Sequence, residues 1–334
     1  MNILILEPYF TGSHKAWAEG YAHYSGHEVR ILSLHGNFWK WRMHGGAVSL
    51  ARKFYELDFT PDLLLATDML DLTIFLSLTR EKTSSLPVAL YFHENQLTYP
   101  WSPSDRDVAK NRDKHYGFIN YASALAADAV FFNSQYHLQA FLSELPGFLR
   151  HFPDQQELET VEQIEAKSRV LPLGLDLERL DAAHLASEDG CRPLILWNHR
   201  WEYDKNPGEF FHALEILADK ELDFEVAIVG ECFSRRPEAF LSAKEKLGDR
   251  IVQFGYVKAF ADYAAWLWKA DILPVTSYQD FFGTSLVEAI YCNCYPILPY
   301  RLAYPELVPS ELHPRHFYND FEELVHKLET AIRN

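Results

Sequence analysis

Two carboxylates flank a glycine turn in the stretch QDFFGTSLVEAIYC, which spans residues 279–292. Asp280 precedes the turn, and Glu288 follows it on a segment whose pattern predicts a helix. The turn comes after an apolar run at 270–277, so the free backbone amides of a helix N-terminus would form an anion site there. The layout suits a diphosphate that carries a sugar near Asp280 and a ribose near Glu288, with amides from Gly283, Thr284 and Ser285.

Two cations that would counter phosphate charge follow a second apolar run, residues 193–200. Arg200 closes that run, and Lys205 stands in the short loop before Pro207, a residue that suits the first turn of a helix. Taken alone, the cations are explained as a solvated pair, and either acid as an ordinary turn or helix residue. The combination of acid, glycine turn, acid and cations favours binding of a nucleotide sugar.

Three more residues stand near the ends of apolar runs, where ligands bind in open α/β sheets. Gly12 lies in the turn after 3–7 and would let the backbone approach a ligand, although a plain turn explains it equally. His93 ends the run 88–93 and would contact a sugar hydroxyl or serve as a structural histidine. Tyr256 follows a glycine near the end of another run and would offer backbone contacts to a base.

The order of the apolar runs predicts an α/β fold with two Rossmann-like domains, because β-rich runs alternate with helix-like segments in both halves of the chain. We place the domains at 1–185 and 186–334, with the final helix at 321–333. The predicted strands are 3–7, 29–34, 62–67, 88–93 and 129–134 in the first half, and 193–200, 224–231, 250–257, 270–277 and 294–299 in the second.

The composition bounds the kind of protein. The chain has 334 residues, of which 48% are hydrophobic and 23% charged, and its formal net charge is −16. These values are typical of a soluble globular protein with two domains and argue against a chain wrapped in nucleic acid. No apolar run approaches the ~20 residues of a membrane helix. The first residues indicate a strand and not a signal peptide, and four cysteines without a disulfide pattern indicate free thiols, so we expect a cytoplasmic protein.

A small basic and aromatic stretch in the first half is the candidate for nucleic-acid contact. Its side chains offer cations for phosphates and rings for stacking on bases. Tryptophans packed within a loop and helix of the first domain explain the same residues equally well. The members are Trp39, Lys40, Trp41, Arg42, Arg52 and Lys53.

These motifs together resemble a retaining glycosyltransferase of the GT-B fold, with Asp280, Phe-Gly and Glu288 in the place of the acidic motif of that class. Asp280 departs from the glutamate that the class usually has. A closer resemblance is to the glycosyltransferase-like domain-containing protein 1 family of tRNA-queuosine mannosyltransferases. It rests on the blocks GSHK (12–15), WKWR (39–42), HENQLTYP (93–100), FFNS (131–134), NHRWEYDKNP (198–207) and EAIYCNCYPILP (288–299).

The resemblance implies transfer of mannose from GDP-mannose, with retained configuration, onto queuosine in tRNA. It implies a cleft between the two domains for the nucleotide sugar, no required metal and no tightly bound cofactor. Arg200, Lys205, Asp280 and His93 would then act in catalysis. Two alternatives stay open: a GT-B glycosyltransferase with a small-molecule, lipid or glycan acceptor, and a non-catalytic nucleotide-binding module.

Overall fold

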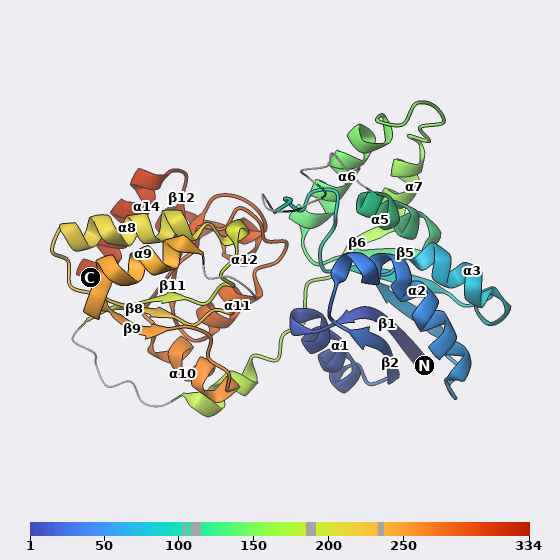
Figure 1. Cartoon of the computed structure of the whole chain (residues 1–334), viewed down its shortest axis with the longest axis horizontal. Coiled ribbons are helices and arrows are strands. Elements are labelled where there is room, and N and C mark those ends of the chain that lie inside the picture. The colour runs from blue at the N-terminus through green and yellow to red at the C-terminus, as the bar shows by residue number, and fades with distance from the viewer. Residues whose placement is uncertain (103–104, 106, 108–114, 185–191, 233–236) are drawn as a thin grey trace. The chain divides into compact units, whose positions relative to one another are not determined.

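The computed structural model describes residues 1–102, 105, 107, 115–184, 192–232 and 237–334, and contains two compact units, Met1–Leu175 and Asp176–Asn334 (Figure 1). The division falls before position 185, where the sequence pattern placed the boundary. The reason is the short 3-10 helix η1 (Glu178–Ala183). Leu180 of η1 is fully buried in a core of the second unit, and its carbonyl accepts a hydrogen bond of 2.9 Å from Trp268 Nε1.

The first unit is a parallel sheet covered by helices on both faces. Alternate residues of β1 enter different cores: Leu4 and Leu6 pack with α2, α3, α5 and α6, whereas Ile3 and Ile5 pack with α1. The strand order is β2 (Glu28–His35), β1 (Asn2–Phe10), β3 (Leu63–Thr67), β4 (Val88–Phe92), β5 (Ala129–Phe132), β6 (Ser168–Val170). The helices are α1 (Gly12–Tyr24), α2 (Trp39–Glu56), α3 (Leu72–Thr83), α5 (His115–Ala126), α6 (Gln135–Leu149) and α7 (Thr160–Ala166).

The second unit repeats this plan. Ile195 and Trp197 of β7 face a core with α8, α9 and α14, and Leu194 and Leu196 face a core with α10 and α11. Figure 1 shows α8 and α9 on one side of this sheet and α10 on the other. The strand order is β12 (Phe317–Tyr318), β11 (Tyr295–Pro299), β10 (Ile272–Pro274), β7 (Leu194–Trp197), β8 (Glu225–Ile228), β9 (Ile251–Phe254). The helices named are α8 (Pro207–Asp219), α9 (Glu238–Leu247), α10 (Phe260–Lys269), α11 (Thr284–Tyr291) and α14 (Phe321–Arg333).

Each sheet has one point where the chain reverses its direction of winding. In the first unit it moves from β1 to β2 and then returns to β3 on the other side of β1. In the second it runs β7, β8, β9 and returns to β10 on the other side of β7. Loops that leave the carboxyl ends of two such strands diverge, and ligands bind in the crevice between them. The β1/β3 and β7/β10 strand ends are therefore the candidate ligand sites of the two units.

Several predicted strands end earlier than their apolar runs. The runs 193–200 and 270–277 form strands only to Trp197 and Pro274, because the next side chains make hydrogen bonds in loops. The two short strands β6 and β12 were missed, since two or three residues carry no periodic pattern. The final helix spans Phe321–Arg333 as predicted.

Free cysteines occur at three described positions, and the burial of their thiols differs. Cys292 and Cys294 are buried, and Cys232 is partly exposed, whereas Cys191 lies outside the described residues. In the part of the chain that the structure describes, no helix is long and apolar enough to cross a membrane.

Gly230 is the glycine whose replacement should be most costly. A Cβ atom at this position would lie 1.6 Å from the carbonyl oxygen of His199. We expect Gly230→Ala to lower the free energy of unfolding by about 2 kcal/mol or more, because backbone cannot yield as a side chain does. The control is Gly208→Ala in α8, where a Cβ would meet nothing within 4 Å. Urea unfolding of both variants checks this, and equal midpoints would contradict it.

Candidate active site

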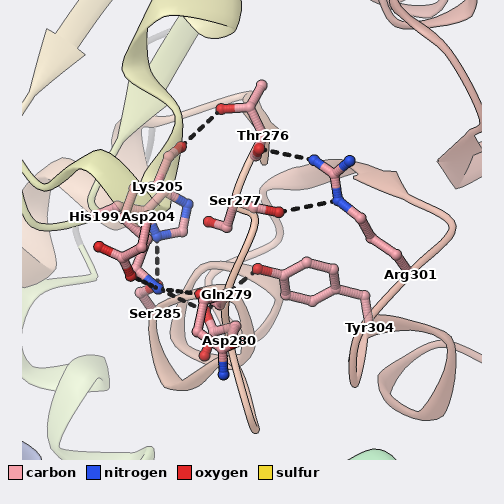
Figure 2. A network of polar contacts seen from close by, with 10 residues as sticks. All are labelled: His199, Asp204, Lys205, Thr276, Ser277, Gln279, Asp280, Ser285, Arg301 and Tyr304. Carbon is pink, nitrogen blue, oxygen red and sulfur yellow. Dashed lines mark hydrogen bonds and ion pairs between the residues drawn. The ribbon is translucent and has the colours of Figure 1, made fainter. Parts of the chain in front are cut away.

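Lys205 joins the loops that leave β7 and β10. Its Nζ donates a hydrogen bond of 2.7 Å to the carbonyl of Gln279, and lies 3.3 Å from Asp204 Oδ2 and 3.4 Å from Asp280 Oδ2 (Figure 2). The side chain is only 10% exposed. A cation at this depth requires carboxylate partners, so Lys205 fixes the position of Asp280 across the switch point.

The backbone around Lys205 is held from the neighbouring loop. Asn206 adopts a left-handed conformation with φ 52°, and Pro207 then begins α8. The hydroxyl of Thr276 lies 3.0 Å from the carbonyl oxygens of both Lys205 and Asn206. The guanidinium of Arg301 donates to the carbonyls of Thr276 and Ser277 at 2.9 and 3.0 Å, which secures the second loop in turn.

Asp280 is partly buried and has a second partner. The hydroxyl of the fully buried Tyr304 lies 3.3 Å from Asp280 Oδ2, the oxygen that also faces Lys205. Both contacts use one oxygen of the carboxylate. The arrangement holds the side chain in place while its 19% exposure leaves part of the carboxylate accessible.

Gly283 is the N-cap residue just before α11, and it has φ +100° and no side chain to cap the helix. The ring of Tyr304 and the side chain of Leu307 pack beneath it, at 3.4 and 3.2 Å from where a Cβ would stand. The first turn is tied to the end of β7, because the carbonyl of Ser285 accepts a hydrogen bond of 2.8 Å from Asn198 Nδ2. The amide end of α11 therefore lies against the loops that carry Lys205 and Asp280, as the sequence predicted.

Glu288 points to α10 and η1. Its carboxylate accepts a hydrogen bond of 2.8 Å from the Tyr263 hydroxyl and lies 3.6 Å from the Arg179 guanidinium. That guanidinium is stacked 4.0 Å from the Phe260 ring. Burial raises the pKa of Glu288, and Tyr263 and Arg179 oppose the rise. Glu288 is thus an anchored acid and not an exposed one, while Arg200 and Tyr256 are exposed at their strand ends.

In the first unit, Glu7 organises the turn after β1. One oxygen of this fully buried carboxylate accepts from the Tyr9 amide at 2.8 Å, and the other lies 3.0 Å from His14 Nδ1. Burial alone would lower the pKa of His14, but the charge and hydrogen bond of Glu7 outweigh it and raise the pKa to about 9. Gly12 begins α1 within this turn with φ +51°, so glycine is favoured there for its conformation.

His93 is held by both of its backbone groups. Its amide donates to Asp68 Oδ1 at 2.8 Å, and its carbonyl accepts from Asn133 Nδ2 at 2.9 Å. The ring lies 4.2 Å from that of His14, and its buried Nε2 has no partner among the described residues. Burial, then the neighbouring His14, lowers the pKa of His93, which keeps this imidazole neutral. It can exchange one hydrogen bond with a ligand.

Sequence reasoning missed the polar residues that support the predicted ones. Glu7, His14, Asp68 and His199 stand near the ends of strands, and that position was the available signal. Glu7, His14 and His93 also offer ligand atoms within 4.8 Å of one another. A metal there would first have to displace the proton that His14 shares with Glu7, and independence from metal stays a prediction.

Most of the positive charges in the basic and aromatic stretch already have partners within the first unit. Lys40 pairs with Asp105 at 2.8 Å and with Asp107, among the rings of Trp39, Trp101 and Tyr116. Arg42 and Lys53 donate to backbone carbonyls of β2, and Arg52 is exposed. Trp41 and the preceding Phe38 are 63% and 79% exposed.

The pair Glu7–His14 should give the protein a distinct dependence of stability on pH. The pKa of His14 is higher in the folded state than the usual 6.5, so its stabilisation is full below pH 6.5 and is lost as pH rises through about 9. We expect Glu7→Gln to remove up to about 3 kcal/mol of stability at pH 6 and much less at pH 10.

Urea unfolding at both pH values measures this difference. Asp68, whose pKa burial raises to about 8, is present in both proteins, so the comparison is between variant and wild type at each pH. His27→Gln, at an exposed position, is the control and should preserve the pH dependence of the wild type. A loss that is the same at pH 6 and pH 10 would contradict the ion pair.

Comparison with known proteins agrees with this architecture. Solved structures of similar fold include the N-terminal domain of trehalose-6-phosphate phosphatase from Candida albicans, with TM-score 0.71 and 14% identity over 100% of this chain and 89% of that one. Sucrose-phosphate synthase from Thermosynechococcus elongatus gives TM-score 0.65 and 15% identity over 100% and 90%. They confirm the predicted GT-B fold.

Sequence comparison identifies the family of the chain. Residues 2–175 match the N-terminal model of tRNA-queuosine alpha-mannosyltransferases, and residues 186–334 match glycosyl transferases group 1. A tRNA-queuosine alpha-mannosyltransferase of Drosophila melanogaster is 38% identical over 98% of this chain and 86% of its own length. The chain therefore belongs to the tRNA-queuosine alpha-mannosyltransferase family and is a glycosyltransferase.

Proposed function

We propose that this protein transfers mannose from GDP-mannose to queuosine in tRNA, with retention of configuration at the transferred carbon. The observation that carries the proposal is the convergence of Lys205, Asp280 and the amide end of α11 at the switch point of the second sheet. Membership of the family supports the acceptor and the sugar. A tRNA acceptor is also consistent with the expected cytoplasmic location of the protein.

The donor diphosphate belongs at the first turn of α11. The helix dipole and the amides from Gly283 to Ser285 would bind it. Lys205 is shared by two carboxylates. We assign Arg200, which is exposed three residues after the end of β7, as a second cation for the diphosphate. These groups face the charge that grows on the leaving phosphate, which is where electrostatic catalysis is most effective.

The sugar and the ribose are assigned to the two acids. Lys205 and Tyr304 hold Asp280 so that its accessible part can accept a hydrogen bond from a sugar hydroxyl. Glu288 has partners on both oxygens, and the ribose hydroxyls would add to them. Gly12 and Tyr256 stay candidates for backbone contacts, and His93 offers a neutral imidazole to a sugar hydroxyl.

The proposed step breaks the bond between the anomeric carbon and the diphosphate oxygen and forms one to a hydroxyl of queuosine. The bonding electrons leave with the diphosphate, and the proton of the acceptor hydroxyl passes to it. No protein nucleophile is needed, and no metal enters the step. The transition state resembles an oxocarbenium ion, so Asp280 near the sugar would also stabilise positive charge.

Trp41 is the better candidate for tRNA contact within the stretch. Its ring lies over Gly45, where a Cβ would come within 2.6 Å of the indole, so glycine makes room for a broad exposed face. Such a face stacks on unpaired bases of an RNA loop. Lys40, paired with two aspartates, is assigned to the internal structure of the first unit.

One experiment distinguishes queuosine in tRNA from a small-molecule, lipid or glycan acceptor. Purified protein is mixed with GDP-mannose, GDP-glucose or UDP-glucose, and with tRNA that contains or lacks queuosine. Mass spectrometry of the nucleosides should show one added hexose only with GDP-mannose and queuosine-containing tRNA. The same donors are also tested with a glycan acceptor. A product on tRNA without queuosine, or none on tRNA while the glycan is modified, would contradict the proposal.

Arg200→Gln should lower kcat by about 100-fold, because one fewer cation faces the leaving phosphate. The urea midpoint of each variant is measured as well, so that a loss of stability is separated from a loss of rate. The control is Arg192→Gln, at the amino end of β7, whose ion pairs with Asp223 and Glu225 lie at the opposite edge of the sheet. Equal kinetics for the two variants would remove Arg200 from the site.

Trp41→Ala should raise the KM for tRNA by about tenfold, since a stacked base contributes about 1–3 kcal/mol. Binding of GDP should not change. Val48→Ala, at an exposed position of the same helix, is the control. Steady-state kinetics with varied tRNA measures the effect, and an unchanged KM would show that Trp41 lies outside the acceptor site.

A further inference from the structure

His199 is a buried histidine at the switch point that the sequence motifs did not single out. It follows β7 by two residues and is 3% exposed. Its Nδ1 lies 3.0 Å from the hydroxyl of Ser285, the second residue of α11 (Figure 2). Its Nε2 is buried and has no hydrogen-bond partner among the described residues. Buried polar atoms are rarely left in this state.

The backbone beside His199 is fixed as firmly as the ring. Gly230 lies so close that only the absence of a side chain admits the His199 carbonyl. The amide of Trp201 donates to the carbonyl of Glu231 at 2.8 Å, which joins the same two loops. With Ser285 on the ring and Gly230 against the carbonyl, the direction of Nε2 is determined before any ligand binds.

The chemistry of the ring follows from its surroundings. Burial, and next the positive charge of Lys205, lowers the pKa of His199 to about 4, although Asp280 and Asp204 oppose the change. The imidazole is therefore neutral at pH 7. When the hydroxyl of Ser285 donates to Nδ1, the ring proton resides on Nε2. A neutral N–H donor then stands beside Lys205 without repelling it.

We propose that His199 binds the donor substrate, with Nε2–H donating to a diphosphate oxygen at the first turn of α11 and Ser285 acting as the positioning residue. This inference rests on the proposed function, because it places the diphosphate at that turn. It adds a directional hydrogen bond to the less directional attraction of Lys205 and the helix dipole. A diphosphate oxygen would accept the hydrogen bond that Nε2–H makes with no described residue.

Two substitutions separate the two ring nitrogens. The amide of Asn reaches the position of Nδ1 and preserves a bond to Ser285, whereas the amide of Gln reaches toward Nε2. We expect His199→Asn to weaken GDP binding by tenfold or more, measured by calorimetry. His199→Gln should stay within about threefold of the wild type. Ser285→Ala should fall between them, because the ring keeps its donor and loses its orientation.

Guanosine is the control ligand, since it has the base and ribose of GDP but lacks the diphosphate. Its affinity should be the same for all four proteins. If His199→Asn binds GDP as the wild type does, or loses GDP and guanosine equally together with its urea midpoint, the assignment of Nε2 is wrong. Wild type that binds neither GDP nor UDP would contradict the proposed function instead. If UDP binds in place of GDP, the same variants are compared with UDP and uridine, and the same outcomes test the role of His199.

Discussion

The buried ammonium of Lys205 is the interaction on which the second unit's site depends. It lies between two loops that leave neighbouring parallel strands, and it contacts Asp204, Asp280 and the carbonyl of Gln279. A buried charge without partners would be too costly to keep, so the loops hold one another in a single arrangement. The start of α11, which follows the second loop, is placed by the same contacts.

The first unit also has buried polar groups at its switch point, but these groups are of different types. At its switch point an acid and a histidine form the buried pair Glu7–His14, and Asp68 and Asn133 hold the backbone of His93. Here the buried groups include a carboxyl, Asp68, whose pKa is raised to about 8 by burial. The second unit presents a cation and a helix N-terminus, which suit an anion. The first presents neutral and paired groups, which suit hydroxyls.

Two residues singled out in the sequence have partners that are distant along the chain, and these partners change how the residues are interpreted. Glu288 looks in the sequence like an ordinary helix acid, but Arg179 and Tyr263 anchor it from earlier segments of the chain. Lys40 reads as a surface cation, but Asp105 and Asp107 neutralise it across separations of 65 and 67. Charge within a short stretch therefore overstated how basic the tRNA candidate surface is.

The sequence by itself determined the fold class, the family and the candidates for ligand-binding residues. Buried parallel strands require continuous apolar runs, and glycine turns and helix starts have local signals, so Gly283 and the final helix could be read directly. Only the tertiary structure decided which polar groups are paired. The salt bridges of Lys205, the orientation of His199 by Ser285 and the pair Glu7–His14 depend on loops that meet at a switch point. No local pattern encodes such contacts, because strand order, and not distance along the chain, brings those loops together.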